Sequence, residues 1–308
     1  MNRLILFLRI IPVLLLASNA WGAGLDVQKV SDRVYALVGE TAQRSPDNLG
    51  NNATFGLVIT DDGLVLIDPG GSEKGAAMLD TAIQTVSSRP VVLVINTGGQ
   101  DHRWLGNHYW KDRGARVIAS AAAVEDQKQR KDLQLSALGR FVGDAGMEGT
   151  IPMHADRTFE GTHRLEAGGV RFQLHHSGQA HTPGDIYVFL PDEGTVFTGD
   201  IVYHDRLLGV GPQSNSKSWL GVFEEIEKLG PGKVIPGHGR AGPLDKSRRE
   251  TGDYLGTLRA RVAEFLEQGG TLDEISRVDQ SEFRFLAVYD QIAGRNAHQV
   301  FQEMEFDF

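Results

Sequence analysis

The sequence predicts an α/β domain in which short strands alternate with turns and amphipathic helices. Residues 34–38, 55–59, 64–67 and 91–95 are runs rich in β-branched and apolar residues that end in turn-forming residues, as buried strands do. Residues 216–229 and 247–267 instead repeat their apolar side chains at the spacing of one helical face. With 308 residues, 41% of them hydrophobic and 23% charged, the chain is long enough for one large α/β domain or two small ones.

Net charge and the absence of cysteine limit which partners the protein can bind and which residues can form its functional site. A formal charge of −9 favours neither a nucleic-acid surface nor an anionic membrane face, so we expect a small-molecule substrate and no nucleic-acid partner. The chain contains no cysteine, which excludes disulfides, thiolate ligands and cysteine nucleophiles. Any metal ion must therefore be held by His, Asp or Glu.

Residues 1–23 have the pattern of a secretory signal peptide. A short basic start precedes an apolar stretch at residues 4–16, and small residues at 17–23 offer cleavage positions. Arg9 and Pro12 leave too little uninterrupted apolar length for a membrane anchor, which needs about 20 residues. We expect a periplasmic or secreted protein that is not attached to a membrane after cleavage.

The first half of the chain places polar residues after two strands. The turn at residues 60–63 predicts a hairpin between the strands 55–59 and 64–67, and a helix is expected at residues 73–86. Asp68 follows the second of these strands and is either a ligand or catalytic carboxylate or, as we favour, an acceptor for backbone N–H groups of a loop. The strand 91–95 ends in a sharp loop that carries Asp101 beside His102.

The second half repeats this arrangement. After an expected helix at 119–139 and a long loop at 143–163, strands are predicted at 170–175, 186–190, 195–198 and 233–236. His181 lies in the turn-rich loop 177–185, Asp200 follows the third of these strands, and His238 follows the fourth between two glycines. Three strand ends thus carry an Asp-His pair, an aspartate and a histidine.

At these residues the sequence resembles the metallo-β-lactamase superfamily of metallo-hydrolases. Five segments carry the resemblance in the family's order and spacing, namely residues 66–68, 96–102, 180–185, 197–200 and 235–239. The resemblance covers nearly all of residues 24–308, and it implies one domain folded as a four-layered αββα sandwich with a metal site at one edge between the sheets. The final segment, 293–305, is similar to the terminal helix of exported members associated with quinoprotein and sulfur-oxidation systems.

The first motif departs from the family's pattern. The family has His-x-His-x-Asp-His, whereas residues 97–102 read TGGQDH, so both imidazoles of the first metal site are missing and the loop is one residue shorter. The resemblance implies that Asp101 and His102 are ligands of the second site, His181 the third imidazole of the first site, Asp200 the bridging carboxylate and His238 the last ligand of the second site.

This ligand inventory predicts a single metal ion. Two imidazoles and up to two carboxylates can hold one Zn²⁺, our first expectation, or Mn²⁺ or Fe²⁺, with a position left open for water. We place Asp101 and His181 among the catalytic residues, with His181 free to bind substrate or to shuttle a proton. Four other histidines near the motifs are expected to be surface or supporting groups, namely His108, His175, His176 and His204.

Two functions follow from this interpretation. The first is an exported metal-dependent hydrolase of ester, thioester or phosphoester-type substrates, with β-lactams disfavoured because the first-motif histidines are missing. The alternative is an inactive periplasmic protein that binds a metal or ligand and assists an oxidoreductase partner.

Overall fold

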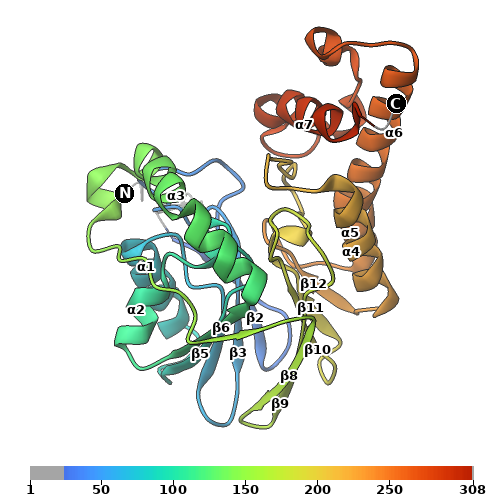
Figure 1. Ribbon diagram of the computed structural model, residues 1–308. Coiled ribbons are helices and arrows are strands. Elements are labelled where there is room, and N and C mark those ends of the chain that lie inside the picture. The colour runs from blue at the N-terminus through green and yellow to red at the C-terminus, as the bar shows by residue number, and fades with distance from the viewer. Residues whose placement is uncertain (1–23, 307–308) are drawn as a thin grey trace, which may run out of the picture.

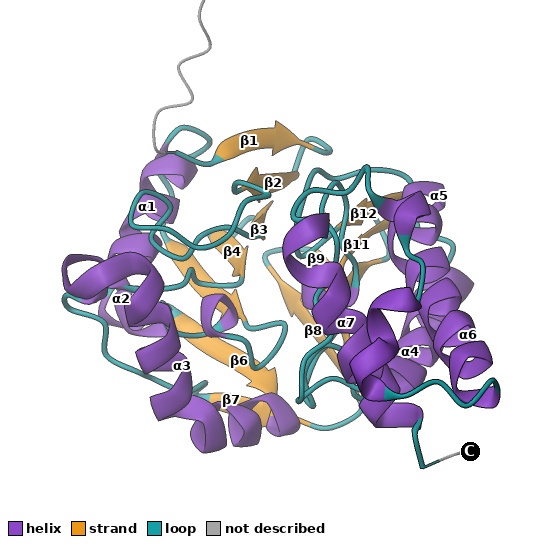
Figure 2. Ribbon diagram, turned by 90° about the horizontal axis from the view of Figure 1, so that it is seen from above, coloured by secondary structure: helices purple, strands orange, loops and turns teal. Residues whose placement is uncertain are grey.

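The computed structural model describes residues 24–306, so the predicted signal peptide lies outside the described residues. Two β-sheets lie face to face in it, and helices cover the outer face of each sheet (Figure 1). The view from above shows the same layers, with the two groups of helices on opposite sides (Figure 2). None of the helices in residues 24–306 combines the length and the apolar character that a membrane span requires.

The first sheet contains seven strands in sequence order. They are β1 (Asp26–Lys29), β2 (Val34–Val38), β3 (Thr54–Ile59), β4 (Leu64–Ile67), β5 (Val91–Ile95), β6 (Arg116–Ser120) and β7 (Arg157–Phe159). Strands β1 to β4 pair antiparallel, and the predicted hairpin joins β3 to β4. From β4 to β7 the pairing is parallel, so these strands end at the same edge of the sheet.

The second sheet has five strands in the order β12-β11-β10-β9-β8. They are β8 (Thr162–Ala167), β9 (Val170–His175), β10 (Tyr187–Leu190), β11 (Thr195–Phe197) and β12 (Lys233–Ile235). Only β11 and β12 run parallel, and the loops that follow these two strands therefore leave the sheet at one edge.

The helices form the two outer layers. The first sheet is covered by α1 (Glu73–Gln84), α2 (Asn107–Asp112) and α3 (Ala121–Met147), and the second by α4 (Ser216–Lys228), α5 (Leu244–Ser247), α6 (Asp253–Glu267) and α7 (Tyr289–Met304) (Figure 1). Helix α1 begins at a serine cap, where the side chain of Ser72 accepts a hydrogen bond from the backbone N–H of Gly75 at 3.0 Å.

Alternation along the strands divides the core into layers. In β4, Val65 and Ile67 pack into the cluster between the two sheets, whereas Leu64 and Leu66 pack against the helices on the other face. Because β4 is buried on both faces, all four of its residues are apolar, and this continuous apolar run is the sequence pattern of a central strand. A third cluster lies between the second sheet and its helices. The chain thus has the expected four-layered αββα architecture.

The structure corrects two expectations in the middle of the chain. The predicted helix at 119–139 begins only at Ala121, because residues 116–120 form β6 and the side chain of Ser120 caps the helix. The helix then continues to Met147, with a break at Gly143 where φ is 73°. The predicted loop at 143–163 instead contains the end of α3, all of β7 and the start of β8. These short strands are stabilised by pairing with their neighbours, and their own sequences carry a weak apolar signal.

Candidate metal centre

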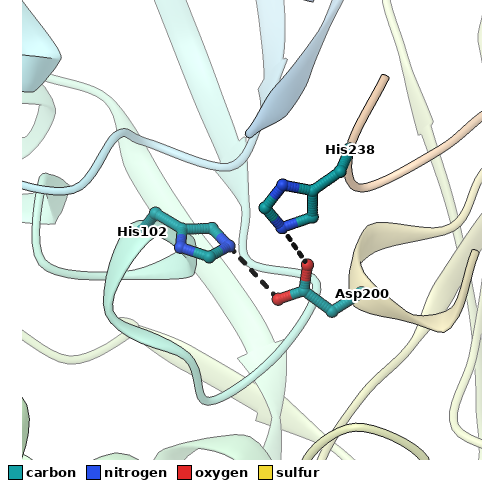
Figure 3. A group of neighbouring side chains, drawn as sticks. All are labelled: His102, Asp200 and His238. Carbon is teal, nitrogen blue, oxygen red and sulfur yellow. Dashed lines mark hydrogen bonds and ion pairs between the residues drawn. The ribbon is translucent and has the colours of Figure 1, made fainter. Parts of the chain in front are cut away.

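Three buried side chains meet at the edge of the sandwich where β5, β11 and β12 end. His102 lies in a 3₁₀ turn (Asp101–Arg103) after β5, Asp200 in a second 3₁₀ turn (Gly199–Ile201) after β11, and His238 in the loop after β12. One ligand atom from each residue lies within 4.8 Å of the others. The three side chains point toward one another (Figure 3), which places two imidazoles and a carboxylate around one point.

Each imidazole is held through Nδ1, which directs Nε2 at the carboxylate. Nδ1 of His238 lies 2.7 Å from the carbonyl oxygen of Asn52, and because a carbonyl can only accept, we assign the proton to Nδ1. Nδ1 of His102 lies 2.9 Å from Oδ1 of Asp101 and 3.0 Å from Nη2 of Arg44. Because Nη2 of Arg44 donates to the same Asp101 oxygen, we assign the proton of His102 to Nδ1 as well. The two Nε2 atoms each lie 3.2 Å from an oxygen of Asp200.

This donor set fits a divalent transition metal. With both protons on Nδ1, two nitrogen lone pairs face a carboxylate, and a cation is what relieves this arrangement. Histidine ligands commonly donate their second N–H to a carboxylate or a backbone carbonyl, as His102 and His238 do here. Burial is the largest cause that lowers the pKa of His238, and it outweighs Asp200, so this imidazole is neutral and able to bind a metal.

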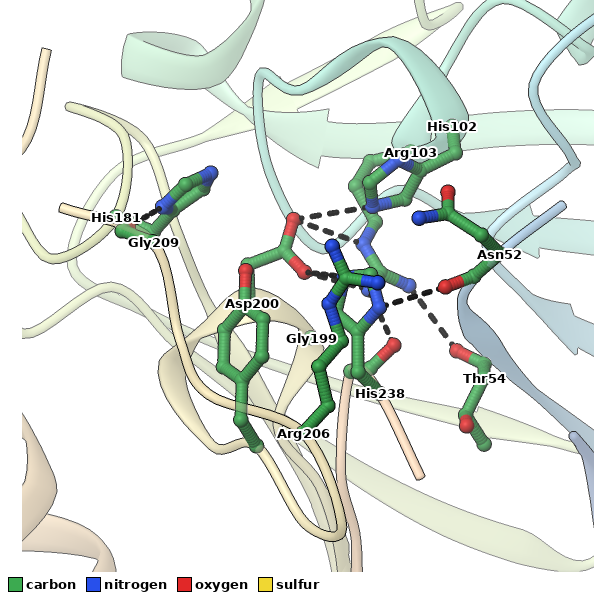
Figure 4. Close-up of polar contacts among 12 residues, drawn as sticks. Asn52, Thr54, His102, Arg103, His181, Gly199, Asp200, Arg206, Gly209 and His238 are labelled. Carbon is green, nitrogen blue, oxygen red and sulfur yellow. Dashed lines mark hydrogen bonds and ion pairs between the residues drawn. The ribbon is translucent and has the colours of Figure 1, made fainter. Parts of the chain in front are cut away.

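A buried arginine fixes the carboxylate of the site. The guanidinium of Arg103 is fully buried and donates to both oxygens of Asp200, at 2.7 and 3.2 Å (Figure 4). It also donates to Asp68 at 2.8 Å and to the carbonyl oxygens of Thr54 and Gly237 at 3.1 and 2.8 Å. Burial alone would raise the pKa of Asp200, but Arg103 and then His102 outweigh it and hold this pKa well below its usual range, so the carboxylate is ionised.

Asp68 contributes to the site indirectly, through its hydrogen bond from Arg103. Its carboxylate accepts hydrogen bonds from the backbone N–H and from the hydroxyl of Thr97, both at 2.7 Å, and its backbone has a φ of 68°. This is the loop-fixing arrangement that we favoured for Asp68. It joins the end of β4 to the loop that carries His102.

Asp101 lies on the far side of the His102 ring. It is 3% exposed, accepts a hydrogen bond from Arg44, and does not belong to the group of three convergent side chains. Burial alone would raise the pKa of Asp101, but Arg44 and His102 lower it below its usual range. A role of Asp101 as a direct ligand stays a prediction, and the contact observed is that of a group that orients the imidazole.

His181 lies apart from the three, on the other side of Asp200 from His102 (Figure 4). Its Nδ1 is 2.9 Å from the carbonyl oxygen of Gly209, so we assign the proton there and leave Nε2 as an acceptor. Burial is the main cause that lowers its pKa, which keeps the ring neutral near pH 7. His181 thus lies outside the group of three, and its roles as a metal ligand and as a catalytic residue stay predictions.

Buried carboxyl groups pack against the two glycines of the first motif. A Cβ atom added to Gly99 would overlap Oδ2 of Asp126, and one added to Gly98 would overlap Oδ1 of Asp185. Asp126 and Asp185 are 5% and 1% exposed, so neither has room to move into solvent. The change of sequence in the first motif is thus accompanied by buried carboxyl groups packed against its two glycines.

The other histidines near the motifs have partners elsewhere. His108 contacts Glu73 at 3.2 Å, and His204 is held by the carbonyl of Arg240 and the hydroxyl of Ser247, both at 2.8 Å. His175 contacts Thr162, and His176 contacts the carbonyl of Asp185. In the described residues none of these four belongs to the convergent group.

The centre opens into a cavity of about 720 Å³, lined by His102, His181 and His238 together with Arg44, Tyr203 and Arg206.

Sequence reasoning missed the three arginines at the site, Arg44, Arg103 and Arg206. For Arg103 a signal existed, since it directly follows the Asp-His pair in a loop that begins at a buried strand. Arg44 and Arg206 lie in segments without a motif.

The comparisons with known proteins agree with this architecture. Residues 50–238, more than half of the chain, match the family model described as the metallo-beta-lactamase superfamily. The chain is 23% identical to "Metallo-beta-lactamase type 2" of Elizabethkingia meningoseptica over 232 residues, which are 71% of this chain and 82% of that protein. It is also 23% identical to the protein of the same name from Bacteroides fragilis, over 77% of this chain and 89% of that one.

Solved structures show the same fold at low identity. A metallo-beta-lactamase from Pontibacter korlensis superposes with a TM-score of 0.61 at 21% identity, covering 75% of this chain and 99% of that one. The stereoselective inverting sec-alkylsulfatase Pisa1 from Pseudomonas sp. gives a TM-score of 0.69 at 20% identity, covering 90% of this chain and 50% of that one. The fold, the order of the motifs and the family match together show that the chain belongs to the metallo-beta-lactamase superfamily.

Proposed function

We propose that the protein is an exported hydrolase that uses one divalent metal ion, Zn²⁺ in the first instance, on an ester, thioester or phosphoester-type substrate. The observation that carries the proposal is the convergence of His102, Asp200 and His238, with both Nε2 atoms directed at the carboxylate, beside a cavity of about 720 Å³. These three residues would hold the ion. Bound there, the ion would supply an acidified water and polarise a carbonyl or phosphoryl oxygen.

The chain's own residues supply the remaining functions. His181 lines the cavity with Nε2 free to accept, so it can take a proton from the attacking water and return it to the leaving group. Arg44 also lines the cavity, where its charge can stabilise an oxyanion that develops on the substrate. Asp101 orients the His102 ring through Nδ1, and Arg103 keeps Asp200 ionised and fixed.

A second candidate function follows from the glycines of the first motif. Buried carboxyl groups pack against the glycines that replace the family's first-site histidines, and loss of this site favours a protein that binds a metal or ligand without turnover. Such a protein would assist a periplasmic oxidoreductase partner. The two candidates differ in whether the metal-loaded protein turns over a substrate.

The test is hydrolysis by the metal-loaded protein. The substrates are 4-nitrophenyl acetate, a thioester such as acetylthiocholine, and bis(4-nitrophenyl) phosphate. We expect turnover of at least one substrate that falls by about 100-fold or more in His181→Gln, because general acid–base groups contribute about 10²–10⁴-fold. His175→Gln is the matched control, since His175 lies outside the cavity and contacts Thr162. Metal binding without turnover of any substrate would favour the accessory role instead.

A further inference from the structure

The loop between β5 and His102 contains two buried glycines, Gly98 and Gly99. Neither has a side chain, so only their backbone groups can contact the rest of the chain. A carbonyl group that is buried away from water needs a hydrogen-bond donor. Because strand β5 ends at Ile95, the donors for these two carbonyl groups must come from another element.

Two buried glutamines of helix α3 supply these donors. Nε2 of Gln127 lies 3.2 Å from the carbonyl oxygen of Gly98, and Nε2 of Gln134 lies 2.8 Å from that of Gly99. Arg130 makes a longer contact to the Gly99 carbonyl, at 3.4 Å. The two glutamines are 0% and 4% exposed. Their spacing is close to two helical turns, so both side chains face the loop.

Gln134 joins the two ends of the turn that carries His102. Its Nε2 donates to Gly99, which precedes the turn, and its Oε1 accepts a hydrogen bond at 2.9 Å from Nε1 of Trp104, which follows the turn. Trp104 is fully buried. An indole can only donate and a carbonyl can only accept, so these two partners fix the orientation of the amide. One side chain therefore holds both the entry and the exit of the turn.

The position of this turn matters because the candidate ligands come from both sheets. His102 follows β5 of the first sheet, whereas the other two ligands follow β11 and β12 of the second. Asp101 orients the imidazole, but it belongs to the same turn and moves with it. Arg103 holds the turn to Asp200, and Gln134 holds it to α3. A shift of the turn would carry Nε2 of His102 away from the point where the three side chains meet.

We propose that Gln134, supported by Gln127, is a positioning residue that places Nε2 of His102 for metal binding. Neither glutamine lines the cavity, so neither touches the metal or the substrate. Each acts on the turn, and through it on Nε2 of His102, which lies 3.2 Å from Asp200. Groups that orient a metal-bound histidine typically contribute about 10–100-fold to metal affinity. This role rests on the metal ion of the proposed function, but neither on the substrate nor on turnover.

Gln134→Met tests this role. Methionine is of similar length, but its thioether cannot donate to Gly99 and accepts only weakly from Trp104. Competition with a chromophoric chelator measures the Zn²⁺ affinity, and the visible absorption spectrum of the Co²⁺-loaded protein reports the coordination geometry. We expect Gln134→Met to weaken Zn²⁺ binding about 10-fold or more and to alter the Co²⁺ spectrum. Gln127→Met, which removes the longer contact to Gly98, should weaken binding by a smaller factor.

Gln280→Met is the matched control. Gln280 is 6% exposed, accepts a hydrogen bond from the hydroxyl of Tyr254 at 2.8 Å and donates to the carbonyl oxygen of Ala293 at 2.9 Å. It thus makes the same two kinds of contact as Gln134, outside the cavity. Both methionine variants should unfold at lower urea concentration, because each loses two buried hydrogen bonds. Only Gln134→Met should change the Zn²⁺ affinity and the Co²⁺ spectrum.

Wild-type affinity and spectrum in Gln134→Met would overturn the inference, and so would an equal loss of affinity in Gln134→Met and Gln280→Met. If Gln134→Met does not fold, Gln127→Met decides, because unchanged Zn²⁺ binding in that variant would overturn the inference and weaker binding would support it.

The same measurements separate this inference from the proposed function. Zn²⁺ binding without hydrolysis would count against the hydrolase alone, since the affinities still test the role of Gln134. A wild type that hydrolyses a substrate but binds Zn²⁺ no more tightly than Gln134→Met would overturn the positioning role and leave the hydrolase proposal standing. A wild type that binds no Zn²⁺, Mn²⁺ or Fe²⁺ would overturn both.

Discussion

Replacement of Gly99 by alanine tests whether the space of the first metal site is filled. The new Cβ would overlap Oδ2 of Asp126 and lie 2.9 Å from its Cγ. Asp126 cannot simply swing away, because it is buried and its carboxylate accepts two hydrogen bonds from Arg130, one of them from Nε at 2.6 Å. The substitution must therefore displace this ion pair or the loop that carries His102.

The expected loss follows from two contributions. Overpacking costs about 1–3 kcal/mol, and weakening the partly buried ion pair adds about 1 kcal/mol. An unfolding entropy of about 2.1 cal/mol/K per residue amounts to about 0.6 kcal/mol/K for a chain of this size. Gly99→Ala should thus reduce the free energy of unfolding by ~2–4 kcal/mol and the midpoint temperature by ~3–7 °C.

Thermal unfolding followed by circular dichroism measures this loss. Gly221→Ala is the matched control, because Gly221 lies in α4 with no atom within 4 Å of the added Cβ, and its midpoint should stay level or rise by ~1–2 °C. In an Asp126→Ala background the cost of Gly99→Ala should shrink, since the two positions share the contact. A Gly99→Ala midpoint within about 1 °C of the wild type would refute the filled-space interpretation.

Three further predictions concern buried charges at and near the centre. If Asp101 only orients His102, Asp101→Asn should weaken metal binding about 10–100-fold, as measured by competition with a chelator. A loss of metal affinity far beyond that range would make Asp101 a direct ligand. Arg103→Met should lower the free energy of unfolding, measured by urea denaturation, by ~3–5 kcal/mol, because the buried carboxylates of Asp68 and Asp200 lose their counterion. A decrease below about 1 kcal/mol would contradict this role of Arg103. Burial raises the pKa of Asp185 to about 8, so the folded protein keeps a proton that the unfolded chain releases near pH 4. The metal-free wild type should therefore lose ~3–5 kcal/mol of stability relative to Asp185→Asn as the pH rises from about 5 to about 9, and parallel pH profiles of the two proteins would exclude the shift.

The sequence was most informative about features that depend on residues close together in the chain. The apolar run at residues 64–67 indicated a strand, and the turn before it, at residues 60–63, indicated the hairpin with the strand 55–59. His102, Asp200 and His238 could be named because they lie in the motifs that resemble the metallo-β-lactamase superfamily, and each of them follows a strand. Strand ends that share an edge bring such residues together, so the order of the motifs predicted their meeting.

The sequence was least informative where a residue acts through distant partners. Arg103 joins Asp68 to Asp200, which lie 35 residues before it and 97 residues after it; its position beside the Asp-His pair places it near the site but does not indicate these two partners. Arg206 depends on backbone carbonyls more than 160 residues earlier. Strand β8 has alternating exposed and half-buried residues without an apolar run, so only its pairing with β9 reveals it.

The metal content of the purified protein tests the central claim most directly. Plasma mass spectrometry, after dialysis against a weak chelator, should find about one transition-metal ion per chain in the wild type. Each of His102→Ala and His238→Ala should lose this ion, whereas His175→Gln, which alters an imidazole outside the centre, should retain it. A wild type that holds no metal after incubation with zinc, manganese or iron, or that holds two ions per chain, would contradict the single-metal centre.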